Sequence, residues 1–268
     1  MRLPILLFTL VFISFSCSTS KKISGGSNAN DYTTGGKVWS SAFQQHAAEY
    51  KALCYQAFNI ARLRLDEAIA RNTTGRPLAI VTDIDETILD NSPYAVKQAL
   101  LGNDFSQSTW EEWTSMGIAD TMPGALAFLK YAASKNVTTF YITNRYDRES
   151  AGTLQNLKRF GFPFAEDAHL LARTAGSGKE ERRRMAAEAH EIVLLLGDNL
   201  SDFSSVFDKK PADERDAMVN ANAAEFGNRF IILPNFNYGG WEEAMFEFRY
   251  NWNAAQKDSI LRSKLRGY

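Results

Sequence analysis

Unbroken runs of apolar residues constrain the fold of this chain more than any other feature. A strand with one face in water alternates apolar and polar side chains, whereas an unbroken run indicates a strand buried on both faces, as in a parallel sheet. Helical segments between the runs favour β-α-β units. The sequence therefore predicts an α/β fold, a Rossmann-like three-layer α/β/α sandwich with a central parallel sheet. The predicted strands are Leu78–Thr82, Val137–Ile142, a shorter one at His169–Leu171, Ile192–Leu196 and Phe230–Leu233.

Apolar spacing and capping residues place helices between and around these strands. Ser92-Pro93 marks a helix start, and Ser108 with Glu111 has the pattern of a capping box. The segment at about 88–122 is therefore expected to be a helical insertion between the first two strands. Further helices should extend both ends of the fold. The other predicted helices are Ser41–Asn72, Gly124–Lys135 closed by Asn136, one capped by Asp147 and ending near Phe160-Gly161, Lys179–Ala189 and Trp241–Leu265.

The N-terminal residues predict an exported lipoprotein. A positive start precedes Leu3–Phe15, which is nearly all apolar but too short to span a bilayer, as expected of a signal peptide over residues 1–16. A small residue directly before Cys17 indicates cleavage and lipidation there; a plain secretory signal with an incidental cysteine is the alternative. Residues 17–37 are polar and predict a lipidated cysteine on a flexible tether. The folded domain is then expected over residues 38–268.

Charge and cysteine content argue against two kinds of protein. The formal net charge is −1, which gives no support to a polymeric nucleic acid as partner. An acylated Cys17 leaves Cys54 as the one other cysteine, so an intramolecular disulfide cannot form. Cys54 lies in a helical pattern, which predicts a buried, inert thiol.

Polar residues gather directly after three of the predicted strands. The groups are Asp83–Thr87, Thr143–Arg145 and Gly197–Asp202, and Lys179 begins the helix that leads into the strand before the third group. Open parallel sheets bind ligands at the carboxyl ends of their strands. We therefore expect the groups to form one site.

Asp83 and Asp85 suit nucleophilic and acid–base chemistry on a phosphate ester. Alternate residues of an extended chain point differently, so Asp83 can attack phosphorus and form an aspartyl-phosphate while Asp85 protonates the leaving oxygen. Crowded carboxylates need a divalent cation, and their hard oxygens select Mg²⁺, for which Asp198 would be a further ligand. Lys179 and Thr143 would hold the phosphoryl oxygens.

Each group taken alone has a simpler structural explanation. An aspartate after a strand is often a turn former or a helix cap, and Lys179 lies beside Arg182–Arg184 on an ordinary charged face. An EF-hand over Asp83–Tyr94 is excluded, because Ile88 stands where glycine is needed and Tyr94 where glutamate is needed. The joint order of the groups, each at a strand end or on the preceding helix, favours catalysis.

The same strings resemble a known family. Asp83-Ile-Asp-Glu-Thr87 with Asp90-Asn-Ser-Pro-Tyr94, Tyr141-Ile-Thr-Asn-Arg145 and Gly197-Asp-Asn-Leu-Ser-Asp202 are similar to motifs of class C acid phosphatases, the lipoprotein e(P4) family of the haloacid dehalogenase (HAD) superfamily. The resemblance runs from about Glu49 to Trp241. It implies a HAD-like phosphatase domain, Mg²⁺ as cofactor and, in the nucleotidase relatives, hydrolysis of 5′-nucleotides.

The resemblance also assigns roles to the matching residues. The catalytic residues would be Asp83 (nucleophile), Asp85 (acid/base), Thr143 and Lys179 (phosphate). The metal ligands would be Asp83, the Asp85 carbonyl, Asp198 and, through water, Asp202. The substrate-binding residues would be Asn144, Arg145 and two aromatic residues that clamp a base, Trp110 and Tyr238. Core packing is the alternative for the two aromatic side chains.

Together these features predict a Mg²⁺-dependent phosphomonoesterase, a 5′-nucleotidase that releases nucleosides outside the cytoplasm. Its partner would be a nucleoside monophosphate, and the lipid would hold it at the bacterial outer membrane. The alternatives are a broad-specificity acid phosphatase or a phosphotransferase, and a periplasmic or secreted protein. A different class is a binding or storage lipoprotein on the same scaffold, but related plant storage proteins lack the nucleophile that Asp83 provides here. Oligomer contacts through the C-terminal helix, as in a homodimer, stay open.

Overall fold

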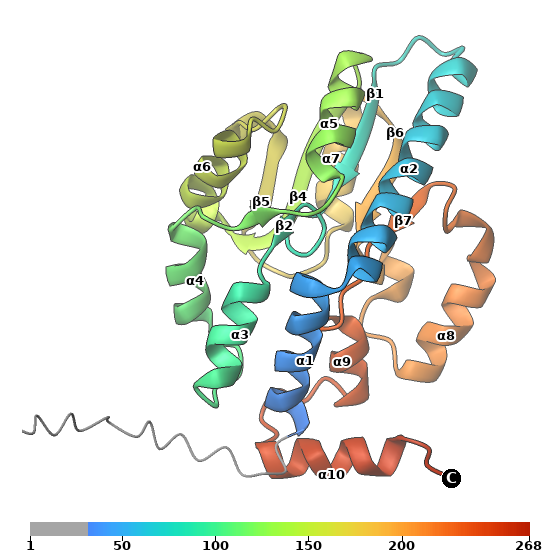
Figure 1. Ribbon diagram of the computed structural model, residues 1–268. Helices are drawn as coiled ribbons and strands as arrows, with labels where there is room; N and C mark the ends of the chain where they lie inside the picture. Colours follow the sequence, from blue (N-terminus) through green and yellow to red (C-terminus); the bar gives the residue numbers. More distant parts are fainter. Residues whose placement is uncertain (1–31) are drawn as a thin grey trace, which may run out of the picture.

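A parallel sheet forms the centre of the computed structural model, which describes residues 32–268. Its five strands lie in the order β5-β4-β1-β6-β7 (Figure 1). β1 pairs on both edges and all of its residues are buried, which explains its unbroken apolar sequence. The parallel sheet is thus confirmed. Its strands are β1 (Leu78–Thr82), β4 (Thr138–Tyr146), β5 (Leu170–Arg173), β6 (Glu191–Gly197) and β7 (Phe230–Ile232).

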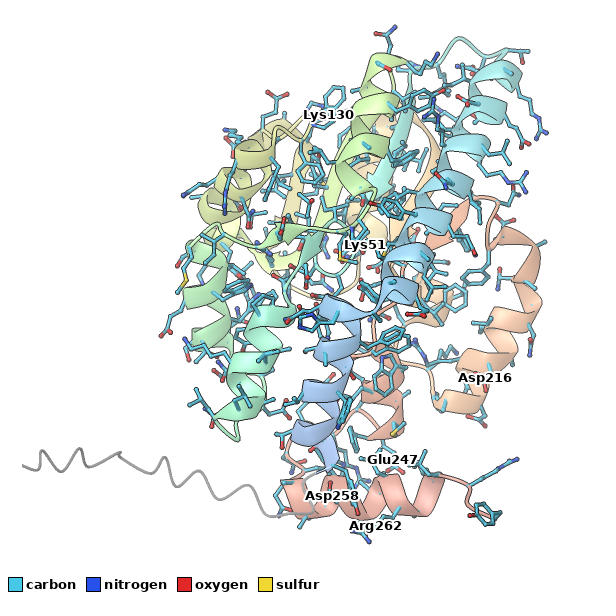
Figure 2. All side chains as sticks on the ribbon, viewed as in Figure 1. Lys51, Lys130, Asp216, Glu247, Asp258 and Arg262 are labelled. Carbon is cyan, nitrogen blue, oxygen red and sulfur yellow. The ribbon has the colours of Figure 1, made fainter. Side chains whose placement is uncertain are left out.

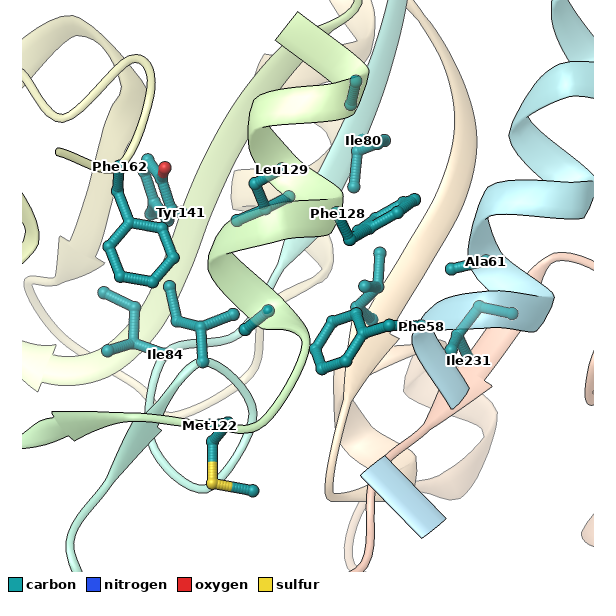
Figure 3. Close-up of a cluster of buried hydrophobic side chains, with 14 of the residues drawn as sticks. Phe58, Ala61, Ile80, Ile84, Met122, Phe128, Leu129, Tyr141, Phe162 and Ile231 are labelled. Atoms are coloured by element: carbon teal, nitrogen blue, oxygen red, sulfur yellow. The ribbon is translucent and has the colours of Figure 1, made fainter. Parts of the chain in front are cut away.

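Helices cover both faces of the sheet, so the predicted three-layer sandwich is confirmed. On one face α2, α5 and α6 contribute to the larger apolar core, where Phe58 and Phe128 lie near Ile80 (Figure 3). On the other face α7 and α8 pack against a second apolar cluster that includes Val81 and Phe203. These helices are α2 (Ala48–Arg71), α5 (Ala125–Ser134), α6 (Ser150–Phe160), α7 (Glu180–Ala189) and α8 (Ala212–Ala221).

The remaining elements gather beyond the carboxyl ends of the strands (Figure 1). The insertion between β1 and α5 holds two helices, as predicted, and an antiparallel pair of two-residue strands that the sequence did not predict. Helices from both ends of the chain close the same side of the fold. These elements are α1 (Tyr32–His46), β2 (Leu89–Asp90), α3 (Ser92–Leu100), α4 (Gln107–Ser115), β3 (Asp120–Thr121), α9 (Gly240–Met245) and α10 (Ala254–Lys264).

Residues 32–37, predicted as part of the tether, are helical because α1 begins at Tyr32; residues 17–31 lie outside the described residues. The Tyr32 N–H donates to Asp258 at 3.0 Å, and the Arg262 guanidinium lies 4.9 Å from the centre of the Tyr32 ring. Both partners belong to α10 (Figure 2). Contacts between the two ends of the chain thus extend the helix into a segment whose composition predicted coil.

Several helix boundaries also differ from the prediction. Ser41–Asn72 is broken at Ala47, whose backbone is extended (ψ 125°), so two helices replace one. Trp241–Leu265 is likewise two helices, α9 and α10, with Glu247 and Phe248 at positive φ between them. The predicted helix start at Ser92-Pro93 is confirmed, since α3 begins at Ser92. Two cap assignments were wrong by a few residues: Ser106, and not Ser108, caps α4, and Asp147 opens a 3-10 turn ahead of α6.

Two sequence predictions concern the cysteines and the membrane. Cys54 is buried and free, as expected, and burial raises the pKa of its thiol to about 12. Cys17 and residues 1–16 lie outside the described residues, so lipidation stays a prediction. Within residues 32–268 no helix combines the length and apolar character needed to cross a membrane.

A carboxylate between two lysines joins the ends of the chain to the insertion. Asp104 accepts from Lys37 of α1 at 2.9 Å and also from Lys257 of α10. Burial acts to raise the pKa of Asp104, but the lysines lower it well below its usual value. A lowered pKa contributes stability above the unfolded-state pKa, about 3.9, and this contribution is lost as pH falls toward the folded-state pKa.

We therefore expect Asp104→Asn to lower the melting temperature at pH 7, with the difference from the parent shrinking below about pH 4. Melting curves from pH 3 to pH 7 measure it. Asp120→Asn, at an exposed position, is the matched control and should follow the parent throughout. A difference that does not depend on pH would contradict the ion-pair explanation.

Candidate active site

The carboxyl end of β1 carries the central carboxylate of the site. The Asp83 N–H donates to the carbonyl of Leu196 on β6 at 2.9 Å, and the next residue, Ile84, is fully buried in the larger core. These contacts fix the backbone on both sides of Asp83, whose side chain is 8% exposed. The nucleophile predicted from the sequence is thus held rigidly where the sheet opens.

Lys179 brings two of the predicted aspartates together. Its ammonium donates to Asp83 and lies 2.7 Å from an oxygen of Asp202, and it is 3% exposed. Burial acts to lower the pKa of Lys179, but Asp202 and Asp83 raise it above its usual value. Burial raises the pKa of Asp83 to about 7, with Lys179 acting to lower it and Asp202 and Asp85 adding to the increase. The lysine is part of the site and not of a solvated face.

A third carboxylate completes a cluster that fits a cation. Oxygen atoms of Asp83, Asp198 and Asp202 lie within 4.8 Å of one another. Burial, Asp202 and Asp83 all raise the pKa of Asp198 well above its usual value, since a single lysine cannot offset three carboxylates. Buried oxygen ligands of this kind suit a hard divalent cation. The cluster therefore has the ligands for the predicted metal, without specifying which metal.

Glycine at position 197 is what allows this cluster to form. A Cβ atom added to Gly197 would collide with the side chain of Asp202. Asp202 in turn accepts from the Asn199 N–H at 2.9 Å, which closes the turn after β6. The Gly-Asp string found in the sequence thus has a steric reason: the turn folds Asp202 back over the end of the strand that presents Asp198.

Asp85 is held by partners outside the three-carboxylate cluster. Its Oδ1 accepts from Nη2 of Arg145 at 2.7 Å and from Asn91 at 2.9 Å, and Nε of Arg145 donates at 3.0 Å. Arg145 is 2% exposed, and Trp113 orients Asn91 by donating to it at 2.8 Å. In this structure Arg145 thus pairs with Asp85, the predicted acid/base residue. The predicted contact of Arg145 with substrate stays a prediction.

The polar residues Thr143–Arg145 lie inside strand β4 and not after it. β4 runs to Tyr146 and regains its pairing with Arg173 of β5 after a shift in register, so Thr143 is fully buried within the strand. Asn144 is exposed, and its side chain accepts from Arg182 at 2.7 Å. The predicted end of this strand at Ile142 was therefore wrong, because the polar residues Thr143 and Asn144 were expected to follow the strand.

Arg182 is a site residue that the sequence analysis assigned to a charged face. Its guanidinium donates to the carbonyl of Thr143, to Asn144, and to the carbonyls of Ser177 and Gly178 just before Lys179. It thereby ties β4 to the loop that precedes Lys179. Its position three residues after Lys179, on the same helix face, was the one available signal.

The two predicted aromatic residues occupy different surroundings. Trp110 is 8% exposed and packs edge-on against Tyr94 at 5.1 Å, and the Arg145 guanidinium lies 5.7 Å from its ring centre. Tyr238 is half-buried and donates its hydroxyl to Glu86. Among the ring contacts of the described residues, none joins Trp110 to Tyr238. A base held between two rings would itself separate them, so the predicted base-binding role of Trp110 and Tyr238 stays a prediction.

Glu86 is a second residue that the sequence analysis did not single out. It is 1% exposed, adopts a positive φ of 54°, and accepts from the Asn91 N–H at 2.8 Å as well as from Tyr238. Burial, together with the nearby Asp85, raises the pKa of Glu86 to about 8, against the effect of its hydrogen bonds. Its side chain connects the Asp83–Thr87 turn to the loop that carries Tyr238.

Comparison with known proteins agrees with this geometry. The model of the HAD superfamily, subfamily IIIB (acid phosphatase), matches residues 14–241. Two crystal structures of the class C acid phosphatase from Bacillus anthracis, one with tungstate bound, each have a TM-score of 0.85 and 39% identity over 89% of this chain and 99% of theirs.

Curated plant proteins are similar over a shorter stretch. The stem 31 kDa glycoprotein of Glycine max is 31% identical over 125 residues, 44% of this chain and 49% of its own. Acid phosphatase 1 of Solanum lycopersicum is 30% identical over 131 residues, 46% of this chain and 50% of its own. The chain thus matches about half the length of these relatives. The family model, which covers most of the chain, and the matched crystal structures together show that the chain belongs to subfamily IIIB of the HAD superfamily, the acid phosphatases, and within it resembles the class C enzymes; these are phosphoric monoester hydrolases.

Proposed function

We propose that the protein is a Mg²⁺-dependent phosphomonoesterase that works through an aspartyl-phosphate on Asp83 and acts as a 5′-nucleotidase outside the cytoplasm. The observation that carries the proposal is the placement of Lys179 against both Asp83 and Asp202, with Asp198 in the same cluster. A buried carboxylate beside a cation is arranged for attack on an anionic phosphate, since the cation offsets the charge of both. The tungstate in the relative from Bacillus anthracis has the tetrahedral shape and charge of phosphate.

The first step transfers the phosphoryl group to the protein. An oxygen of Asp83 bonds to phosphorus as the bond to the leaving oxygen breaks, and protonated Asp85 gives that oxygen its proton. In the second step Asp85 takes a proton from water and the water oxygen bonds to phosphorus as the bond from phosphorus to the Asp83 oxygen breaks. This frees inorganic phosphate and restores the Asp83 carboxylate. Lys179 and Thr143 would hold the phosphoryl oxygens during both steps.

The acid/base role requires Asp85 to exchange partners. In this structure both of its oxygens face the guanidinium of Arg145. We assign Arg145 the role of holding the carboxylate at the edge of the phosphate site, from which a change of side-chain rotamer brings it to the leaving oxygen. A bound Mg²⁺, held by Asp83, Asp198 and the Asp85 carbonyl with Asp202 through water, would neutralise the charge that gathers around phosphorus.

Release of phosphate from a substrate panel tests the proposal. The panel holds nucleoside 5′-monophosphates, a 3′-monophosphate and p-nitrophenyl phosphate, each with Mg²⁺ and with EDTA. We expect turnover that EDTA removes and Mg²⁺ restores, with a preference for 5′-monophosphates. Equal turnover of every ester would leave a broad-specificity acid phosphatase, and transfer to added alcohols a phosphotransferase. No metal-dependent turnover of any ester would contradict the proposal and favour a binding or storage protein.

The base preference is expected to depend on Tyr238. Stacking of a base on an aromatic side chain contributes about 1–3 kcal/mol, so Tyr238→Ala should raise KM for a 5′-nucleotide about tenfold and change KM for p-nitrophenyl phosphate about threefold at most. If the Trp110 ring also contacts the base, Trp110→Leu should likewise raise KM for the 5′-nucleotide more than KM for p-nitrophenyl phosphate. Tyr250→Ala, at a position 77% exposed, is the control and should leave both constants unchanged. An equal effect on both substrates would assign Tyr238 to packing.

The proposed location rests on the N-terminal sequence. Cleavage before Cys17 and acylation of that residue would anchor the protein at the bacterial outer membrane, whereas an unmodified Cys17 would leave it periplasmic or secreted. In cells that express the full chain, Cys17→Ala should move the protein from the membrane to the soluble fraction. The same distribution for both proteins would argue against the anchor.

A further inference from the structure

A chain of hydrogen bonds, buried at its α1 end and partly buried at Asp198, runs from helix α1 to the carboxylate of Asp198. The side-chain amide of Asn237 donates to Oε1 of Gln44 on α1 at 2.9 Å. The Asn237 N–H donates to Oδ1 of Asn235 at 2.8 Å, and the side-chain amide of Asn235 donates to Oδ2 of Asp198 at 2.8 Å. Three consecutive links thus join a helix outside the α/β sandwich to a predicted metal ligand.

Every polar group along this chain has a partner. Gln44 also donates to Asp90 at 2.7 Å, and Ser41 of α1 donates to Oδ1 of Asn237 at 3.1 Å. Gln44 is 7% exposed and Asn237 is 2% exposed. At Gln44 and Asn237 the satisfied hydrogen bonds favour one geometry, because a rearrangement there leaves a buried donor or acceptor unpaired.

The network fixes the orientation of Asp198. Oδ2 of this carboxylate accepts from Asn235, and Oδ1 accepts from Thr87 at 3.2 Å. A hydrogen bond to each oxygen sets the rotation of the carboxylate, and such partners of metal ligands typically change metal affinity or activity 10- to 100-fold. Asn235 also accepts from the Tyr238 N–H at 3.4 Å, so the same residue positions the backbone of the predicted base-binding aromatic residue.

We propose that Asn235 is a positioning residue for Asp198, and that Gln44 acts through Asn237 to hold Asn235 in place. Helix α1 is then part of the active-site machinery. The role of the helix cannot be replaced by packing alone, because the links are directional and end on a carboxylate of the cation site. This inference rests on the proposed use of Asp198 as a metal ligand.

Cation binding without substrate tests the inference on the chain as it exists. The melting temperature of the parent is measured against Mg²⁺ concentration, and the concentration that gives a fixed rise is compared with that of Asn235→Ala and Gln44→Leu. We expect this concentration to rise about tenfold for Asn235→Ala and about threefold for Gln44→Leu. Gln45→Leu is the matched control, because Gln45 is exposed on the same helix and bonds to Ser92 and not to Asn237.

A double variant separates positioning from general destabilisation. If Gln44 acts through Asn235, the Mg²⁺ requirement of the Gln44→Leu/Asn235→Ala protein should equal that of Asn235→Ala alone. The inference would be overturned if the increases in Mg²⁺ requirement of the two single variants multiply in the double variant. A folded Gln44→Leu protein with a parent-like Mg²⁺ requirement would also overturn it. Either result would leave the metal site intact. If Gln44→Leu does not fold, a parent-like Mg²⁺ requirement in Asn235→Ala overturns it equally. No shift in the parent with Mg²⁺ would instead remove the proposed metal, and this inference with it.

Discussion

Asp83→Asn should reduce kcat by a factor of at least about 10³ with every phosphomonoester, while the protein stays folded. The amide has the size of the carboxylate and keeps an acceptor for Lys179, but it cannot form the aspartyl-phosphate. The variant also removes one of three crowded carboxylates, so its melting temperature without metal should not fall below that of the parent. Phosphate release and melting curves on the same preparation measure both effects.

Two further variants make this result interpretable. Asp83→Ala excludes activity regenerated by deamidation of asparagine, and Asp213→Asn, in an exposed position on α8, shows the effect of the same change elsewhere. Asp213→Asn should keep parental kcat. Turnover above about 1% of the parent in both Asp83 variants would mean that another group attacks phosphorus, and the assignment of Asp83 would be wrong.

The sequence predicted the sheet well because its strands are buried on both faces. β1 and β6 consist almost entirely of apolar residues, and such runs have few other structural uses. The site followed from the sheet: Asp83 and Asp198 lie at the ends of adjacent parallel strands, which topology alone brings together. Lys179 could be placed only by its order in the chain, since its burial depends on tertiary contacts.

What the sequence could not predict depends on contacts between distant segments. The extension of α1 to Tyr32 requires Asp258, 226 residues away. The links of Asn235 and Asn237 to Asp198 and Gln44 likewise join positions far apart in the chain. Asparagine in a loop is an ordinary turn residue by composition, so nothing local marks these two as parts of a network. The same holds for Glu86, whose partner Tyr238 is 152 residues away.

Lys179→Met should affect activity and stability together. Methionine has a similar length but no charge, so Asp83 and Asp202 would stay buried without their shared cation. Removing one partner of a buried ion pair typically costs about 3–5 kcal/mol, and the expected loss in the free energy of unfolding without metal is of that size. Loss of the charge that holds the phosphoryl oxygens should also reduce kcat/KM by about 10²-fold or more. Denaturant unfolding and phosphate release measure the two effects.

Addition of Mg²⁺ separates these two consequences. A divalent cation among Asp83, Asp198 and Asp202 replaces the missing positive charge, so it should recover part of the stability that Lys179→Met loses. It should not recover kcat/KM, because the ammonium that would contact the phosphoryl oxygens is still absent. Lys158→Met, at an exposed position on α6, is the control and should match the parent in both measurements. Full recovery of kcat/KM with Mg²⁺ would show that Lys179 only balances the carboxylates and does not bind the phosphoryl group.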